Sequence, residues 1–185
     1  MLKHKGTVTI ETPRLILRKA KIEDAEAMFR NWANDPEVTK FLTWPTHGNI
    51  EITKTLLESW VENYQKEDYY QWMIVLKEID EPIGSIMANT VGRAQSAHIG
   101  YCIGKTWWHQ GIMSETLKAV MDFLFDEVGY HRIEAMHDSH NPHSGAVMKK
   151  CGMQYEGTLR SADWNNQGIC DACYYSILRN EVQYE

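Results

Sequence analysis

The sequence predicts a mixed α/β fold in a single domain. Strand-like and helix-like segments alternate along the chain, with a strand–helix–strand–helix unit at the centre and two further strands at the end. A length of 185 residues and a hydrophobic content of 43% suit one domain with a core of its own. We therefore expect residues 1–185 to form one domain without linkers or repeats.

The first segments are a strand and two amphipathic helices. RLILRKA is typical of a strand. Residues 22–34 carry apolar side chains at helical spacing, and the pair Asp35-Pro36 ends that pattern. After the loop FLTWPTHGN, residues 50–66 repeat the helical pattern through Ile52, Leu56, Leu57, Trp60 and Tyr64.

Three strands are expected next. YQWMIVLKE and GSIMANTVG are largely apolar runs, with a turn in EIDEPIG between them. SAHIGYCIG alternates in character, so the side chains of one face are Ala97, Ile99, Tyr101 and Ile103.

A long helix is predicted after the paired tryptophans Trp107 and Trp108. Gly129 suits its end. Its buried stripe consists of Met113, Leu117, Val120, Met121, Leu124 and Val128. RIEAMHD is the next strand, and Asn141-Pro142 opens a short helix with Asn as the cap. Two last strands, around YEGTLRSAD and CDACYYSILR, flank the turn WNNQG.

Composition argues against several classes of protein. The net charge of −6 gives no positive surface for nucleic acid. No run reaches the roughly 20 apolar residues of a membrane span, and MLKHKGTVTIETPRL lacks the apolar stretch of a signal peptide. The pair Cys170 and Cys173 has C-x-x-C spacing, but in an alternating, strand-like run and without further metal ligands. We therefore expect a cytoplasmic protein with no metal, no nucleic acid and no membrane partner.

WWHQGIMSET, residues 107–116, carries the first functional signal. Gly111 lies between a strand and the start of the long helix. This arrangement places unpaired N–H groups and the positive end of the helix dipole at one point, which suits a phosphate or pyrophosphate. Many strand-to-helix turns carry a glycine and bind nothing, so both interpretations stay open at this point.

Five segments stand in a recognisable order along the chain. They are ETPRLILRKAKIEDAEAMF, NDPEVTKFL, WMIVLKEIDEPIGSI, HIGYCIG with WWHQGIMSET, and HRIEAMHDSHNPHSGAVMKKCGM. This set resembles the GCN5-related N-acetyltransferases (GNAT), specifically the RimJ/RimL-type branch that acetylates ribosomal-protein N-termini and related amines. The resemblance implies an α+β fold with a mixed, mostly antiparallel seven-stranded sheet and helices on both faces. Its fourth and fifth strands would splay apart and receive the pantetheine arm of acyl-CoA.

The resemblance implies an enzyme that transfers an acetyl group from acetyl-CoA to a primary amine, foremost the α-amine of a protein or peptide. Two alternatives stay open. One is a small-amine, amino-acid or antibiotic N-acetyltransferase. The other is a non-catalytic regulatory protein that binds acyl-CoA, because His109 and Met113 depart from the family's loop pattern. The amine acceptor is the expected partner, and a homodimer is left open.

The family's loop pattern Q/R-x-x-G-x-G/A falls on residues 108–113, of which only the central Gly111 is kept. The resemblance also implies that the fourth strand's backbone pairs with pantetheine and that Asn141 and Ser144 approach the cofactor. The implied cofactor-binding residues are Tyr101, Cys102, Ile103, Trp108, His109, Gln110, Gly111, Ile112, Met113, Ser114, Asn141, Ser144 and Lys150. Structural alternatives exist for several of them: core packing for Met113, a plain helix cap for Asn141 and a surface position for Lys150.

Attack of an amine on a thioester needs an oxyanion donor, a proton acceptor and a stabiliser of the leaving thiolate. A main-chain N–H near Cys102 is the implied oxyanion donor. Ser144 is the candidate beside the thiolate, because Met148 replaces the tyrosine of a related polyamine branch. His98, where relatives often have Glu, is the candidate base, although a strand histidine is often merely packed.

The acceptor pocket is expected between the first two helices and the final hairpin. Its candidate substrate-binding residues are Trp44, Trp72 and Trp164. Most large aromatic residues belong to a core. Trp44 and Trp164, which lie in loop or turn surroundings, are therefore the preferred candidates.

Overall fold

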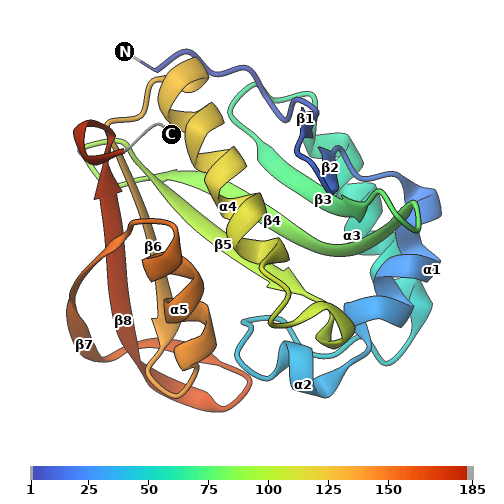
Figure 1. Cartoon of the computed structure of the whole chain (residues 1–185). Coiled ribbons are helices and arrows are strands. Elements are labelled where there is room, and N and C mark those ends of the chain that lie inside the picture. The colour runs from blue at the N-terminus through green and yellow to red at the C-terminus, as the bar shows by residue number, and fades with distance from the viewer. Residues whose placement is uncertain (1, 183–185) are drawn as a thin grey trace.

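The computed structural model describes residues 2–182 as one eight-stranded sheet with helices on both faces (Figure 1). The strands are β1 (Ile10–Glu11), β2 (Leu15–Arg18), β3 (Tyr70–Leu76), β4 (Glu81–Val91), β5 (Ser96–Ile103), β6 (Arg132–Asp138), β7 (Gln154–Asn165) and β8 (Gly168–Leu178). Their order across the sheet is β1-β2-β3-β4-β5-β6-β8-β7, and β5 with β6 is the parallel pair. The predicted fold class is confirmed, and the two-residue β1 accounts for eight strands where seven were expected.

The helices follow the predicted pattern with local irregularities. They are α1 (Ala25–Met28), α2 (Pro36–Thr39), α3 (Ile50–Asn63), α4 (Ile112–Phe123) and α5 (Pro142–Lys150). A 3-10 turn, Ile22–Asp24, leads into α1, and π-helical turns, Phe29–Ala33 and Leu124–Val128, extend α1 and α4. Asp35 and Pro36 end the first helical segment as predicted. They also begin α2, because the Asp35 carboxylate accepts the Glu37 N–H at 2.9 Å. Within residues 2–182, no helix has the length and apolar content to cross a bilayer.

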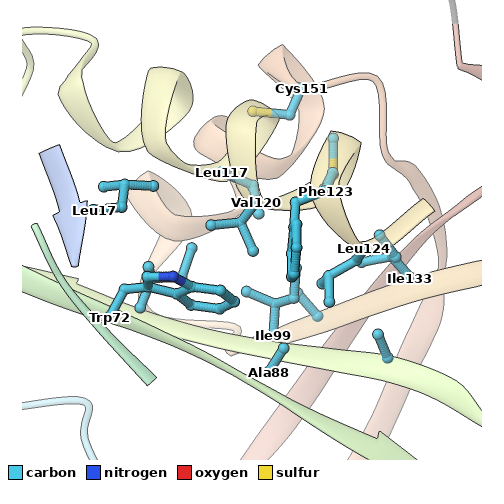
Figure 2. Close-up of a cluster of buried hydrophobic side chains, with 14 of the residues drawn as sticks. Leu17, Trp72, Ala88, Ile99, Leu117, Val120, Phe123, Leu124, Ile133 and Cys151 are labelled. Carbon is cyan, nitrogen blue, oxygen red and sulfur yellow. The ribbon is translucent and has the colours of Figure 1, made fainter. Parts of the chain in front are cut away.

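The face of the sheet that carries α4 and α5 holds the larger core (Figure 1). Leu117 and Val120 of α4 are fully buried and lie over Trp72 and Ile99 of the sheet (Figure 2). Each such side chain contributes about 1.5–3 kcal/mol of hydrophobic stabilisation. The whole predicted stripe of this helix is buried, and Gly129 ends it in a left-handed conformation with φ 91°. The prediction for the central helix is therefore confirmed.

The opposite face of the sheet packs against the N-terminal helices. Trp32 from the turn after α1 and Leu57 from α3 are fully buried there. They meet Met73 and Val75 of β3, whose neighbours in the strand point to the other core. Both faces of β3 are therefore covered.

The parallel pair at the centre of the sheet is very short. Its register holds Ala97 opposite Ile133 and His98 opposite Glu134, and no further. Beyond these residues β5 stays paired with β4, and β6 with β8. The two strands therefore splay apart toward their carboxyl ends, as expected, and leave backbone groups of β5 without a partner strand.

Candidate functional site

A cleft of about 670 Å³ lies beside the splayed part of β5. Its walls come from β5, the loop and first turn of α4, α5, and the segment from Glu37 to Leu42. Most of the predicted cofactor-binding residues line it: Tyr101, Cys102, Ile103, Trp108, His109, Gly111, Ile112, Met113, Ser114, Asn141, Ser144 and Lys150. Gln110 is outside this lining, and its amide donates to the Thr106 carbonyl at 2.9 Å.

The loop before α4 has an unusual backbone. Gly111 occupies the N-cap in the left-handed region, with φ 73°, and no side chain caps the helix. The first N–H groups of α4 are therefore directed at the cleft without a partner from the helix itself. His109 is also left-handed, with φ 60°. An L-residue in this conformation costs about 1–3 kcal/mol, which the surrounding loop must offset.

Two cations stand over this loop. Lys150 Nζ is 3.6 Å, and Arg14 Nη2 3.8 Å, from the point where a Cβ on Gly111 would lie. Arg14 is held in place by Glu115 at 2.7 Å and by the carbonyl of Gln110 at 3.0 Å. Sequence patterns do not reveal Arg14, because it lies in the turn between β1 and β2, almost a hundred positions before the loop.

A histidine pair lies on the same side of the cleft. The rings of His109 and His143 have centroids 4.9 Å apart and planes 77° apart. His143 lies on α5 and lines the cleft, and the sequence analysis missed it. The two rings therefore lie beside the end of the cleft where Lys150 supplies a positive charge.

Ser144 is paired with a phenol from β5. Its hydroxyl donates to the Tyr101 hydroxyl at 3.2 Å, and Tyr101 donates to the Ser144 carbonyl at 3.0 Å. Burial raises the pKa of Tyr101, so this phenol stays protonated at neutral pH. Sequence reasoning treated Tyr101 only as backbone; its side chain in fact fixes the start of α5 and Ser144 with it.

The N–H of Cys102 is directed away from the splay. Gly104 donates to the Ile83 carbonyl at 2.8 Å, and Gly84 is the register partner of Ile103. In an antiparallel ladder this pattern turns the N–H of Cys102 toward β4. Tyr101 and Ile103 instead turn their backbone groups toward the gap, where the Ile103 carbonyl already accepts the Trp108 Nε1–H at 2.9 Å. An oxyanion donor near Cys102 is thus to be sought on Tyr101. Burial also raises the pKa of the Cys102 thiol, which excludes a ready thiolate.

His98 lies on the other face of the sheet from α4 and outside the cleft lining. Alternation along β5 places it on the side of Cys102, whereas Ala97 and Ile99 belong to the α4 core. Its Nδ1 is 3.8 Å from Glu134 Oε1. Burial lowers the pKa of His98, and the neighbouring Glu134 opposes that effect, so the imidazole is neutral near pH 7.

The three predicted acceptor tryptophans have different positions. Trp72 is fully buried, stacks on Tyr70 and donates its Nε1–H to the Val8 carbonyl at 2.6 Å. It has no surface to offer an acceptor, so its assignment is corrected to the core. Trp164 is 56% exposed on β7. Trp44 is half-buried and packs beside His47, with ring centroids 5.1 Å apart.

Asn166, in the turn between β7 and β8, joins that hairpin to the segment after α2. Its amide Nδ2 donates to the carbonyls of Thr39 and Trp44, each at 2.8 Å. Its backbone N–H donates to the Leu42 carbonyl at 3.1 Å. The structure therefore brings the segments of Trp44 and Trp164 together, as the expected acceptor pocket requires.

Asn141 and Met113 both line the cleft, and their structural alternatives can be compared with their surroundings. Asn141 occupies the N-cap of α5, but its side chain makes no capping hydrogen bond and faces the cleft. Met113 and Met148 are both buried in the core on the α4 side. Among residues 2–182, no three His, Cys, Asp or Glu side chains gather in a way that could hold a metal ion.

Comparison with known proteins relates this geometry to a family. Residues 14–154 match the model of the acetyltransferase (GNAT) domain. The uncharacterized N-acetyltransferase YoaA of Bacillus subtilis is 33% identical, over 92% of this chain and 96% of its own. An acetyltransferase of the GNAT family from Bacillus anthracis superposes with a TM-score of 0.82 at 24% identity, over 94% of this chain and 99% of that one. RimL, a ribosomal L7/L12 α-N-protein acetyltransferase in complex with coenzyme A, gives a TM-score of 0.81 at 22% identity, over 92% and 98%.

Proposed function

The chain belongs to the GNAT family of N-acetyltransferases, and from that premise we propose that acetyl-CoA is its donor and the α-amine of a protein or peptide its acceptor. The observation that carries the proposal is the cleft that joins the open backbone of β5 to the uncapped start of α4. The wall of this cleft then offers the first N–H groups of α4 to phosphates and the open backbone edge of β5 to amide groups.

The residues of the cleft fit the donor. The first N–H groups of α4, with Lys150 and Arg14 beside Gly111, supply hydrogen bonds and positive charge for a pyrophosphate. Tyr101 and Ile103 offer backbone groups to the amides of a pantetheine arm, as an added strand pairs with an edge. RimL is described with coenzyme A bound, which supports the same choice.

Acetyl-CoA supplies an activated thioester carbonyl. We assign the Tyr101 N–H to the negative charge that develops on the carbonyl oxygen, which leaves the Tyr101 carbonyl and the Ile103 N–H for the pantetheine amides. The Ser144 hydroxyl, whose single hydrogen is directed at the Tyr101 oxygen, turns that hydrogen to the sulfur as the thiolate leaves. His98 accepts the proton that the amine loses, a task that suits an imidazole that is neutral near pH 7.

Three observations favour an α-amine as the acceptor. An α-amine has a pKa near 8 and a lysine near 10.4, so the α-amine is far more often neutral at pH 7 and demands less of a base. Met148 is buried in the core, so α5 offers no tyrosine of the polyamine type. RimL, by its description, acts on a protein α-amine.

The test is a measurement of thiol release from acetyl-CoA with a panel of acceptors. We expect peptides with a free N-terminus to give a higher kcat/KM than spermidine or an aminoglycoside. Blocking the α-amine should remove turnover even when internal lysines remain. Equal rates on the blocked, lysine-bearing peptide would refute the α-amine assignment. Faster turnover of spermidine or the aminoglycoside would favour a small-amine N-acetyltransferase. If no acceptor is turned over, a non-catalytic regulatory protein would be favoured.

A further inference from the structure

His98 and Glu134 are the last facing residues of β5 and β6 before the strands part. Both side chains are mostly buried, with 23% and 19% exposed, and both lie on the sheet face opposite α4 and α5. A carboxylate and an imidazole therefore meet at the floor of the opening in the sheet. Their closest atoms, Nδ1 and Oε1, are 3.8 Å apart.

The second oxygen of Glu134 is already held. Arg132 Nε donates to Glu134 Oε2 at 3.1 Å. The guanidinium is itself fixed by two bonds to Glu156, at 2.8 and 2.6 Å, and by one to Ser176 Oγ at 2.8 Å. This leaves Oε1 directed at His98 and gives Glu134 little freedom to turn away.

We propose that Glu134 is a positioning residue for His98, which acts as the general base at the floor of the splay. The inference rests on the proposed function, because it assigns the base of that reaction. The carboxylate favours the tautomer with hydrogen on Nδ1, so Nε2 is the ring nitrogen free to accept a proton. It also stabilises the imidazolium that forms in the reaction.

The amine nitrogen forms a bond to the carbonyl carbon, and the carbon–sulfur bond breaks with its electron pair on sulfur. The nitrogen gives its proton to His98 Nε2. The thiolate accepts a hydrogen bond from Ser144 and later takes a proton from solvent, to which His98 returns its own.

Several charged and titratable groups surround this pair. Glu134 on β6 and Asp163 on β7 both raise the pKa of His98, against the larger lowering by burial. Arg132 on β6 lies beyond Glu134, and Tyr174 on β8 lies near both carboxylates. Removing the charge of Glu134 must therefore lower the pKa of His98 further, because one of the raising charges is lost and burial stays.

The test compares pH profiles of kcat/KM for the wild type and for Glu134→Gln. The acid limb should move to lower pH by about one unit, the smaller end of the effect of a charge at this distance. The plateau should fall about 10–100-fold, the loss found when a carboxylate that orients a metal-bound histidine is removed. Glu134→Asp keeps the charge but shortens the side chain, so its acid limb and its plateau should lie between those of the wild type and Glu134→Gln. Glu127→Gln is the control, because it removes a carboxylate that pairs with Lys5 and with neither His98 nor Arg132, and its acid limb should not move.

Histidine NMR titration of the free proteins gives a readout that does not depend on turnover. The His98 signal should titrate at lower pH in Glu134→Gln than in the wild type, even if every acceptor fails and the proposed function is wrong. An unmoved titration would overturn the inference. So would a moved titration with an unchanged rate profile, because the contact would then exist without serving catalysis.

Discussion

Replacing Gly111 by alanine tests whether the start of α4 binds the phosphates of the donor. The new Cβ meets no backbone, since its nearest neighbours are Lys150 Nζ at 3.6 Å and Arg14 Nη2 at 3.8 Å. The variant should therefore fold. Its cost is the left-handed backbone at φ 73°, about 1–2 kcal/mol, or about 2–8 °C in Tm for a domain of this size.

The effect on acetyl-CoA binding is larger and separable. The methyl group projects into the space between the loop and the two cations, where a pyrophosphate would lie. At a concentration of 100 Kd, acetyl-CoA should stabilise the wild type by about 2.7 kcal/mol, or about 5–11 °C. We expect Gly111→Ala to weaken binding at least tenfold, which removes about 1.4 kcal/mol of that stabilisation.

The assay is thermal unfolding with and without acetyl-CoA, and the chain offers its own control. Gly129, at the other end of the same helical segment, has φ 91° and open space around a new Cβ. Gly129→Ala should lose a similar amount of Tm but keep the full acetyl-CoA shift. A full shift in Gly111→Ala as well would show that the donor does not use this loop.

Three further predictions concern the same region. Ser144→Ala should lower kcat by about tenfold to a thousandfold and leave the affinity for acetyl-CoA nearly unchanged in calorimetry. The reason is that the hydrogen bond of Ser144 strengthens only as charge develops on sulfur. A loss of affinity with intact kcat would make Ser144 a binding residue. Lys150→Gln should weaken coenzyme A binding and flatten its dependence on salt concentration, and an unchanged salt dependence would remove Lys150 from the site. Gly145→Ala should destabilise the fold by about 1–3 kcal/mol in urea unfolding, because the new Cβ would lie 2.4 Å from His137 Nε2. Alanine in place of glycine stabilises most helices. A gain in stability would therefore contradict the tight packing of α5 on β6.

The periodicity of apolar residues along the chain predicted the helices and strands whose side chains must face a core. The stripe from Met113 to Val128 identified the central helix, because each of its residues had to face the core. The same reasoning failed for Trp72, since an aromatic residue in an apolar strand looks the same whether it is core or pocket. The irregular turn Phe29–Ala33 was also missed, because π-helical geometry leaves no apolar pattern of its own.

Contacts between distant segments were beyond the sequence. Arg14 reaches the loop of Gly111 only because β2 and the start of α4 lie side by side in the fold. The pairing of His98 with Glu134 depends on the register of two parallel strands joined by a long helix. The family resemblance pointed to the loop of Gly111 and to Ser144 as candidates. The direction of the Cys102 N–H, away from the gap, became visible only from the register of β5 with β4.

The three hydrogen bonds of Asn166 have a consequence for altering which amines the enzyme accepts. They bind the β7–β8 turn to the segment of Thr39, Leu42 and Trp44. Two stretches more than a hundred positions apart in the sequence are therefore held in a fixed relative position. Replacing Asn166 would remove the two side-chain bonds, and a graft that moves the carbonyls of Thr39, Leu42 and Trp44 would break all three. If the proposed acceptor pocket lies here, segments 36–48 and 163–170 should be exchanged together when the acceptor preference is redesigned.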